Sequence, residues 1–275
     1  MEAFISFAEY MEDLIIWHAL GQKKSGFYID VGAYDPYDLS VTKSFSMNGW
    51  RGINIEPLKN RYEELLADRP NDINLNVAIS KEEKWVMLHE AGGGSTLEEQ
   101  VLKSVRRNNA LTGSSKIWAT TLDKVIEQFI GNQDTIDFIK IDVEGHEKEV
   151  LMSINLEISR PRIFVVESVV PWKGTAAYHS WEEILLTNGY KLGLDFRNNR
   201  YYFDSFKAEL DFIKPMQLYK KYKIIMTCSP NDKYRWTYMA IESLLSEYPI
   251  LRRLSLAVVR FLYPIVGRFF PHLVK

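Results

Sequence analysis

The sequence predicts an α/β protein built on a doubly wound, mostly parallel sheet. Short apolar runs that are typical of strands alternate with runs whose apolar residues recur at helical spacing. Two of the strand-like runs end in an acid, Asp30 in the first and Glu56 in the second, as expected where strands meet a ligand-binding edge. The 275 residues, 46% of them hydrophobic, are enough to bury the core of such a sheet.

The chain begins with residues 1–20, which contain four acidic residues where a signal peptide would have a basic start and an unbroken apolar stretch. We therefore expect an amphipathic helix here, as part of a helical cap over residues 1–26. Cys228 is the only cysteine, which excludes an intramolecular disulfide and fits a cytoplasmic protein.

The middle of the chain is expected to alternate strands with helices. Arg69 and Pro70 end one helix, and the spacing of Leu122, Val125 and Ile126 predicts another after a polar stretch. The expected strands are 27–33, 52–57, 73–80, 85–91, 136–142 and 162–168, and the expected helices are 40–48, 58–67 and 121–129.

After the last parallel strand, residues 178–188 are expected to form a helix with Gly189 as its C-terminal cap, and residues 191–204 a β-hairpin. Residues 1–205 then form the main domain, and residues 206–275 form a mainly helical C-terminal extension. Its expected helices cover 234–248 and 251–263.

The acids Asp30 and Glu56 indicate which cofactor this edge would hold. A dinucleotide needs glycines and a bare helix N-terminus facing its pyrophosphate, and Asp30 would repel that anion. S-adenosylmethionine has no phosphate and carries a sulfonium and an ammonium group, which an acid attracts. A carboxylate that closes the second strand can also bind a ribose diol. We therefore predict S-adenosylmethionine rather than NAD, the alternative being that both acids are solvated strand ends.

Five motifs in order along the chain resemble the FkbM family of S-adenosylmethionine-dependent methyltransferases. They are DVGAYDP (30–36), GWRGINIEP (49–57), TTLDKVI (120–126), IDFIKIDVEGHEKEVL (136–151) and NRYYF (199–203). The resemblance implies the Rossmann-like sheet of class I methyltransferases, closed by an antiparallel hairpin. It also implies O-methylation of a hydroxyl, with a sugar of a glycan or surface polysaccharide as the acceptor. It places Asp30, Gly32, Ala33, Glu56, Pro57 and Asp142 at the cofactor.

The first loop departs from the methyltransferase pattern, because Asp35 and Pro36 stand where a third glycine is usual. Proline fixes φ and removes an amide donor, so this loop is expected to be stiffer. The departure keeps a second hypothesis open, namely a catalytically inactive protein of the same fold that serves as a binding or scaffold subunit.

Methyl transfer to a hydroxyl requires a group near the acceptor that takes its proton. Candidates are Asp142, Glu144 and His146, which follow one strand directly, and Glu167, which ends the next. The alternatives are a locally bonded helix N-terminus for His146, a helix cap for Glu144 and a surface acid for Glu167. No metal centre is predicted, because the spacing of these residues matches no metal motif; the alternative is that these four residues bind Mg²⁺, which would acidify the hydroxyl.

The glycine-rich run 92–94 is expected to form a mobile loop, whose Ser95 and Thr96 offer hydroxyls to a polar acceptor. A plain surface turn is the alternative. Trp172, His179 and Trp181 are further candidates for stacking on a sugar ring, although the helical spacing of Trp181 with Leu185 favours a core position.

The formal net charge of −2 argues against a nucleic-acid partner. After Glu247 the chain contains no acid, while arginines recur within the apolar segment 251–270. Such a segment is too charged to span a membrane. It is expected to contact the inner face of a membrane peripherally, to form a homodimer, or to pack on the catalytic domain.

Overall fold

The computed structural model describes residues 4–130, 135–204 and 224–226. The chain divides into two compact units, Ser6–Leu218 and a second one formed by Met1–Ile5 with Tyr219–Lys275. Strands β1 (Phe4–Ser6) and β12 (Ile224–Met226) pair in a two-stranded sheet. The helices expected over 234–248 and 251–263, and the segment 251–270, lie outside the described residues.

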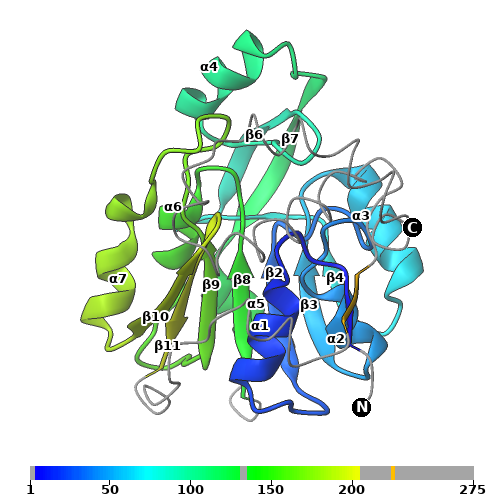
Figure 1. The fold of residues 1–275 in the computed structure, drawn as a ribbon. Coiled ribbons are helices and arrows are strands. Elements are labelled where there is room, and N and C mark those ends of the chain that lie inside the picture. The colour runs from blue at the N-terminus through cyan, green and yellow to red at the C-terminus, as the bar shows by residue number, and fades with distance from the viewer. Residues whose placement is uncertain (1–3, 131–134, 205–223, 227–275) are drawn as a thin grey trace, which may run out of the picture. The chain divides into compact units, whose positions relative to one another are not determined.

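A seven-stranded sheet forms the centre of the unit Ser6–Leu218 (Figure 1). Its order is β10-β11-β9-β8-β2-β3-β4, and β4, β3, β2, β8 and β9 run parallel while β11 and β10 form an antiparallel hairpin. The strands are β2 (Phe27–Val31), β3 (Arg51–Ile55), β4 (Ile73–Leu75), β8 (Phe138–Ile141), β9 (Ile163–Glu167), β10 (Lys191–Phe196) and β11 (Asn199–Phe203). The predicted mostly parallel sheet is confirmed. Its chain order reverses between β2 and β8, where sheets of this kind bind ligands.

Helices cover both faces of this sheet, because alternate residues of each strand point to opposite sides. On one face, Ile29, Ile139 and Phe164 join a core with apolar residues of α5, α6 and α7. On the other face, Phe138 packs against Phe45 of α2. The helices are α1 (Glu12–Ala19), α2 (Lys43–Met47), α3 (Lys59–Asp68), α5 (Leu122–Phe129), α6 (Glu147–Leu151) and α7 (Glu182–Thr187). Among the described residues, no helix has the length and apolarity needed to cross a membrane.

The helix expected over residues 1–20 is shorter than the sequence pattern indicates. Residues 4–6 are a strand, and α1 begins only at Glu12. Met11 adopts the left-handed conformation with φ 64°, which a continuous helix does not allow, and the Glu12 carboxylate accepts a hydrogen bond from Tyr10 N. The prediction of one long N-terminal helix was therefore wrong.

A second, three-stranded sheet lies between β4 and β8 in the sequence, with the order β5-β7-β6. It contains β5 (Ala78–Ile79), β6 (Lys84–Glu90) and β7 (Gly113–Thr120), and α4 (Glu99–Arg107) joins β6 to β7. The single strand expected over 73–80 was wrong. It splits at Asn76, whose side chain donates hydrogen bonds to the carbonyls of Glu56 and Pro57. The polar stretch that precedes residue 121 contains α4 and β7, neither of which was predicted.

Candidate active site

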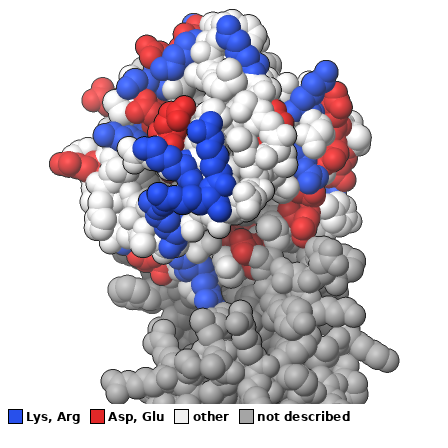
Figure 2. Space-filling model, turned by 90° about the horizontal axis from the view of Figure 1, so that it is seen from above, with Lys and Arg blue, Asp and Glu red and all other residues white. Residues whose placement is uncertain are grey.

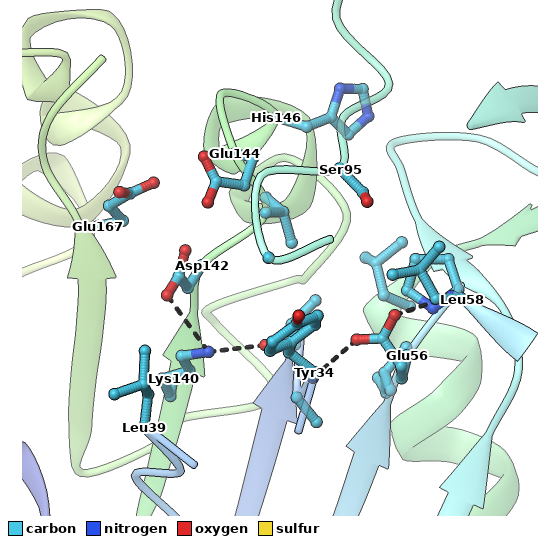
Figure 3. A pocket seen from close by; sticks show the side chains of 18 of the residues that line it. Tyr34, Leu39, Glu56, Leu58, Ser95, Lys140, Asp142, Glu144, His146 and Glu167 are labelled. Carbon is cyan, nitrogen blue, oxygen red and sulfur yellow. Dashed lines mark hydrogen bonds and ion pairs between the residues drawn. The ribbon is translucent and has the colours of Figure 1, made fainter. Parts of the chain in front are cut away.

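A cavity of about 350 Å³ lies at the edge where the parallel strands end (Figure 3). This volume falls within the range of small-molecule sites. Its lining comes from the turns after β2 and β3, the ends of β8 and β9, and the loop after β6. The predicted site residues that line it are Gly32, Ala33, Glu56, Pro57, Ser95, Asp142, Glu144, His146 and Glu167.

Gly32 brings the turn after β2 against the end of β8. Its φ is +80°, and a Cβ at this position would lie 1.9 Å from the carbonyl oxygen of Asp142. Glycine is required here both for the left-handed conformation and for the close approach of the two chains. The turn therefore presents bare backbone to the cavity.

Lys140 joins the ends of β2 and β8 from beneath the cavity. Its Nζ donates to Gly32 O at 2.7 Å and lies 3.4 Å from Asp30 Oδ1 and 3.5 Å from Asp142 Oδ2. Burial acts to lower the pKa of Lys140, but the two carboxylates outweigh it and raise that pKa. The ammonium group is thus held charged between two acids.

Asp30 lies one step behind the cavity rather than in its lining. It is 1% exposed, and its Oδ2 accepts a hydrogen bond from Thr42 Oγ1 at 2.7 Å. Asp30 pairs with Lys140, and Lys140 in turn contacts Gly32 and Asp142, which do line the cavity. Its expected direct contact with a cofactor stays a prediction.

Glu56 is a buried carboxyl group that follows β3 and is 3% exposed. Its Oε2 accepts a hydrogen bond from Tyr34 N at 2.7 Å, and its Oε1 accepts one from Leu58 N at 2.8 Å. Burial raises the pKa of Glu56 to about 7 despite these two bonds. Carboxylate oxygens have further lone pairs, so the group retains capacity to accept bonds from a diol in the cavity.

Residues 142–147 form a tight turn that projects Glu144 into the cavity. Glu144 and Gly145 both have positive φ, 55° and 102°. The Glu147 carboxylate, not that of Glu144, accepts the hydrogen bond from Gly145 N at 3.0 Å. The Glu144 carbonyl accepts one from Thr96 Oγ1 at 2.8 Å. The helix-capping alternative for the Glu144 side chain is therefore wrong.

The His146 imidazole lines the cavity but is held by two partners outside its own turn. Nδ1 donates to Glu98 Oε1 at 2.6 Å, which lowers the pKa of Glu98, and Nε2 lies 3.2 Å from Ser80 Oγ. In the neutral ring, donation from Nδ1 leaves Nε2 as the acceptor of the Ser80 hydroxyl proton. His146 therefore joins the turn to Ser80, which follows β5, and to Glu98, which precedes α4.

The two hydroxyl residues of the glycine-rich loop lie in different places. Ser95 lines the cavity, where its Oγ accepts from Ala91 N and donates to Gly92 O. Thr96 is 1% exposed and does not line the cavity; besides its bond to Glu144 O, its Oγ1 accepts from Glu98 N at 3.0 Å. The expectation that Thr96 offers its hydroxyl to an acceptor was wrong.

The atypical Asp35 and Pro36 do not line the cavity. Asp35 accepts hydrogen bonds from Tyr37 N and Asp38 N and pairs with Arg61, and the Pro36 carbonyl accepts from Arg69. These contacts fix the loop from its outer side. Trp181 is 1% exposed and belongs to the core, as its spacing favours.

Three contributors to the site were not among the predicted site residues, namely Tyr34, Glu98 and Lys140. Tyr34 and Lys140 lie within the motifs DVGAYDP and IDFIKIDVEGHEKEVL, whereas Glu98 lies outside all five motifs. Only Lys140 leaves a signal, as a cation within the apolar run of β8. Within the described part of the chain, no group of three or more His, Cys, Asp and Glu residues has the geometry of a metal site.

The ionisation of Glu144 is expected to make the free energy of unfolding fall as pH rises. Burial, then Asp142 and Glu147, raise the pKa of Glu144 from 4.5 to about 9. Between these values the folded protein keeps a proton that the unfolded chain has lost, so the free energy of unfolding decreases as pH rises. In urea unfolding at pH 5, 7 and 9, Glu144→Gln is expected to flatten this decline, by up to about 1.4 kcal/mol per pH unit. The exposed Glu183→Gln serves as the control, and an equal slope in Glu144→Gln and wild type would contradict the assignment.

Comparison with known proteins adds one match. A family model described as the Methyltransferase FkbM domain matches residues 30–192, which include every cavity residue discussed above. No curated protein matches the chain.

Proposed function

The chain belongs to the FkbM methyltransferase family, and from this premise we propose that it is an S-adenosylmethionine-dependent O-methyltransferase that acts on a carbohydrate hydroxyl. The observation that carries the proposal is the cavity itself. It combines bare backbone at Gly32 and Ala33 with a buried carboxyl group, Glu56, two strand positions away from Asp142.

The charged residues that line the cavity fit S-adenosylmethionine better than a cofactor that carries phosphate groups. Seven acids line the cavity, whereas Lys140 is its one lysine or arginine among the described residues. Lys140 already forms ion pairs with Asp30 and Asp142. Such a lining attracts a ligand with positive charge and repels a pyrophosphate.

The residues along this edge of the sheet would have different roles in binding and catalysis. Glu56 would bind the ribose diol, Pro57 and Leu58 would contact the base, and Gly32 and Ala33 would lie against the amino-acid portion. The cofactor supplies a methyl group on a positively charged sulfur. Asp142, Glu144 and Glu167 face the remaining space, where a hydroxyl must be oriented and must lose its proton.

A polar acceptor is supported by the far wall of the cavity. Asn198 and Asn199 line it together with Glu12, whose Oε1 accepts a hydrogen bond from Asn199 Nδ2 at 3.0 Å. Amides and carboxylates of this kind hydrogen-bond to hydroxyl-rich ligands. Asn199 also begins the NRYYF motif, which resembles family members of surface polysaccharide pathways.

Thermal unfolding tests the cofactor assignment. Saturating S-adenosylhomocysteine is expected to raise the melting temperature, since a ligand at 100 times its dissociation constant stabilises a protein by about 2.7 kcal/mol. Glu56→Gln is expected to remove most of this gain, because it weakens the diol contact and its single amide oxygen keeps only one of the two bonds from Tyr34 N and Leu58 N. Glu183→Gln should retain the full gain. Stabilisation by NAD without any by S-adenosylhomocysteine would refute the proposal.

A further inference from the structure

Glu167 is a buried acid with an unsatisfied oxygen at the wall of the cavity. It ends β9, is 9% exposed, and its Oε2 has no hydrogen-bond partner among the described residues. Figure 3 shows its carboxylate turned toward the space that Asp142 and Glu144 also face. A buried acceptor of this kind requires a donor, and the cavity is where a ligand would supply one.

The protein does not supply a cation to this wall from the described part of the chain. Lys140 Nζ is occupied by Gly32 O, Asp30 and Asp142. No lysine, arginine or histidine of the described residues forms a salt bridge with Glu144 or Glu167. The two acids are therefore left facing one another and Asp142 without a counter-charge of their own.

The proposed ribose contact lies too far away to account for this wall. Glu56 follows β3 and Glu167 ends β9, and the order β3-β2-β8-β9 separates them by three strand spacings, roughly 14 Å. In Figure 3 the labelled side chains of Tyr34 and Lys140 lie between them. Glu144 and Glu167 thus belong to the acceptor side of the cavity.

The acidity is local to the cavity. Figure 2 shows Lys and Arg side chains interspersed with acids on the face seen from above, including a basic group near its middle.

The pKa values of the two acids in the cavity are raised. Burial, with Asp142 next, raises the pKa of Glu144 to about 9, and burial with Asp142 and Glu144 raises the pKa of Glu167 well above its usual range. A positively charged group placed between them would stabilise their ionised forms.

An organic cation fits this wall better than a metal ion. The described residues contain no cluster of acids and histidines with metal-binding geometry. An ammonium group donates three hydrogen bonds in different directions, which suits three carboxylates that are spread over two strand ends and a turn. We propose that Asp142, Glu144 and Glu167 form a subsite for a protonated amino group on the acceptor, so that the substrate class is an amino-bearing carbohydrate.

This inference rests on the proposed function and is tested by ligand binding to the full-length protein. With S-adenosylhomocysteine saturating, the dissociation constants of D-glucosamine, D-glucose and N-acetyl-D-glucosamine are measured by NMR titration. D-Glucosamine is expected to bind at least 10-fold more tightly than the two neutral sugars. Glu167→Gln is expected to abolish most of this preference, and Glu183→Gln to preserve it.

Glu167→Gln should fold, because glutamine keeps the shape of the side chain and burial already favours the neutral form of Glu167. Its binding of S-adenosylhomocysteine should equal that of wild type. The Glu144→Gln variant provides a second measurement, with the same expected loss of preference. An added 0.5 M salt should also weaken the preference, because it arises from charge.

The possible failures can be told apart. If S-adenosylhomocysteine binds and the three sugars bind equally, the amino subsite is refuted while the proposed function stands. If S-adenosylhomocysteine does not bind, the proposed function itself fails. If Mg²⁺ binds to the wild type and Glu167→Gln abolishes that binding, the wall is a metal site and the amino subsite is refuted.

Discussion

Replacement of Asp142 by asparagine is expected to slow methyl transfer by roughly 10²–10⁴-fold, the range for a positioned acid–base group. Asp142 lines the cavity at the end of β8, with its carboxylate 3.5 Å from Lys140 Nζ and 38% of its side chain exposed. It is therefore both accessible to an acceptor and fixed in direction by a buried cation. The measurement is single-turnover methyl transfer to an identified acceptor.

Two comparisons make this result specific. Binding of S-adenosylhomocysteine to Asp142→Asn should change little, so the loss must come from the chemical step. His146→Ala should cost less than Asp142→Asn, because both ring nitrogens of His146 are already bonded, to Glu98 and Ser80. If His146→Ala were the more damaging substitution, the imidazole would be the base and Asp142 would have another role.

The second large effect is expected from Lys140→Met, in the free energy of unfolding. Lys140 and Asp30 are both buried, and loss of the ammonium leaves the Asp30 carboxylate without its counter-charge. Breaking a buried pair from one side typically costs about 3–5 kcal/mol. Urea unfolding of the wild type and the variant measures this loss directly.

The double variant Lys140→Met/Asp30→Asn is the decisive control. An asparagine oxygen can still accept the hydrogen bond from Thr42 Oγ1, and no buried charge then remains uncompensated, because Asp142, the other partner of Lys140, has 38% of its side chain exposed. The double variant is expected to recover at least half of the stability lost in Lys140→Met. A double variant no more stable than Lys140→Met would show that the pair is not coupled.

The central sheet could be predicted because its strands are short apolar runs with clear ends. Residues of β2, β3, β8 and β9 are buried almost throughout, and such runs read as strands wherever helices separate them. The run 73–80 is also short and apolar, and this pattern led to the wrong prediction of a single strand there. Nothing in its composition shows that Asn76 bonds to the chain after β3 and divides the run between two sheets.

The candidate site could be predicted in part, because acids at strand ends meet at one edge of a parallel sheet. Glu56, Asp142 and Glu167 follow this rule and line the cavity. Glu98 does not, since it precedes α4 and its bond to His146, which precedes α6, joins residues 48 apart in the sequence. The burial of Thr96 likewise depends on tertiary contacts that a glycine-rich sequence leaves open.

The contacts of the loop between β6 and α4 with the turn 142–147 have a consequence for protein engineering. Thr96 and Glu98 hold Glu144 and His146 by two side-chain contacts, whereas the proposed ribose contact Glu56 belongs to the central sheet. The loop between β6 and α4 also reaches the proposed cofactor side, because Gly92 and Gly93 lie against Tyr34, whose N–H donates to Glu56. Redesigning this loop while Gly92 and Gly93 are kept therefore offers a route to a new acceptor range.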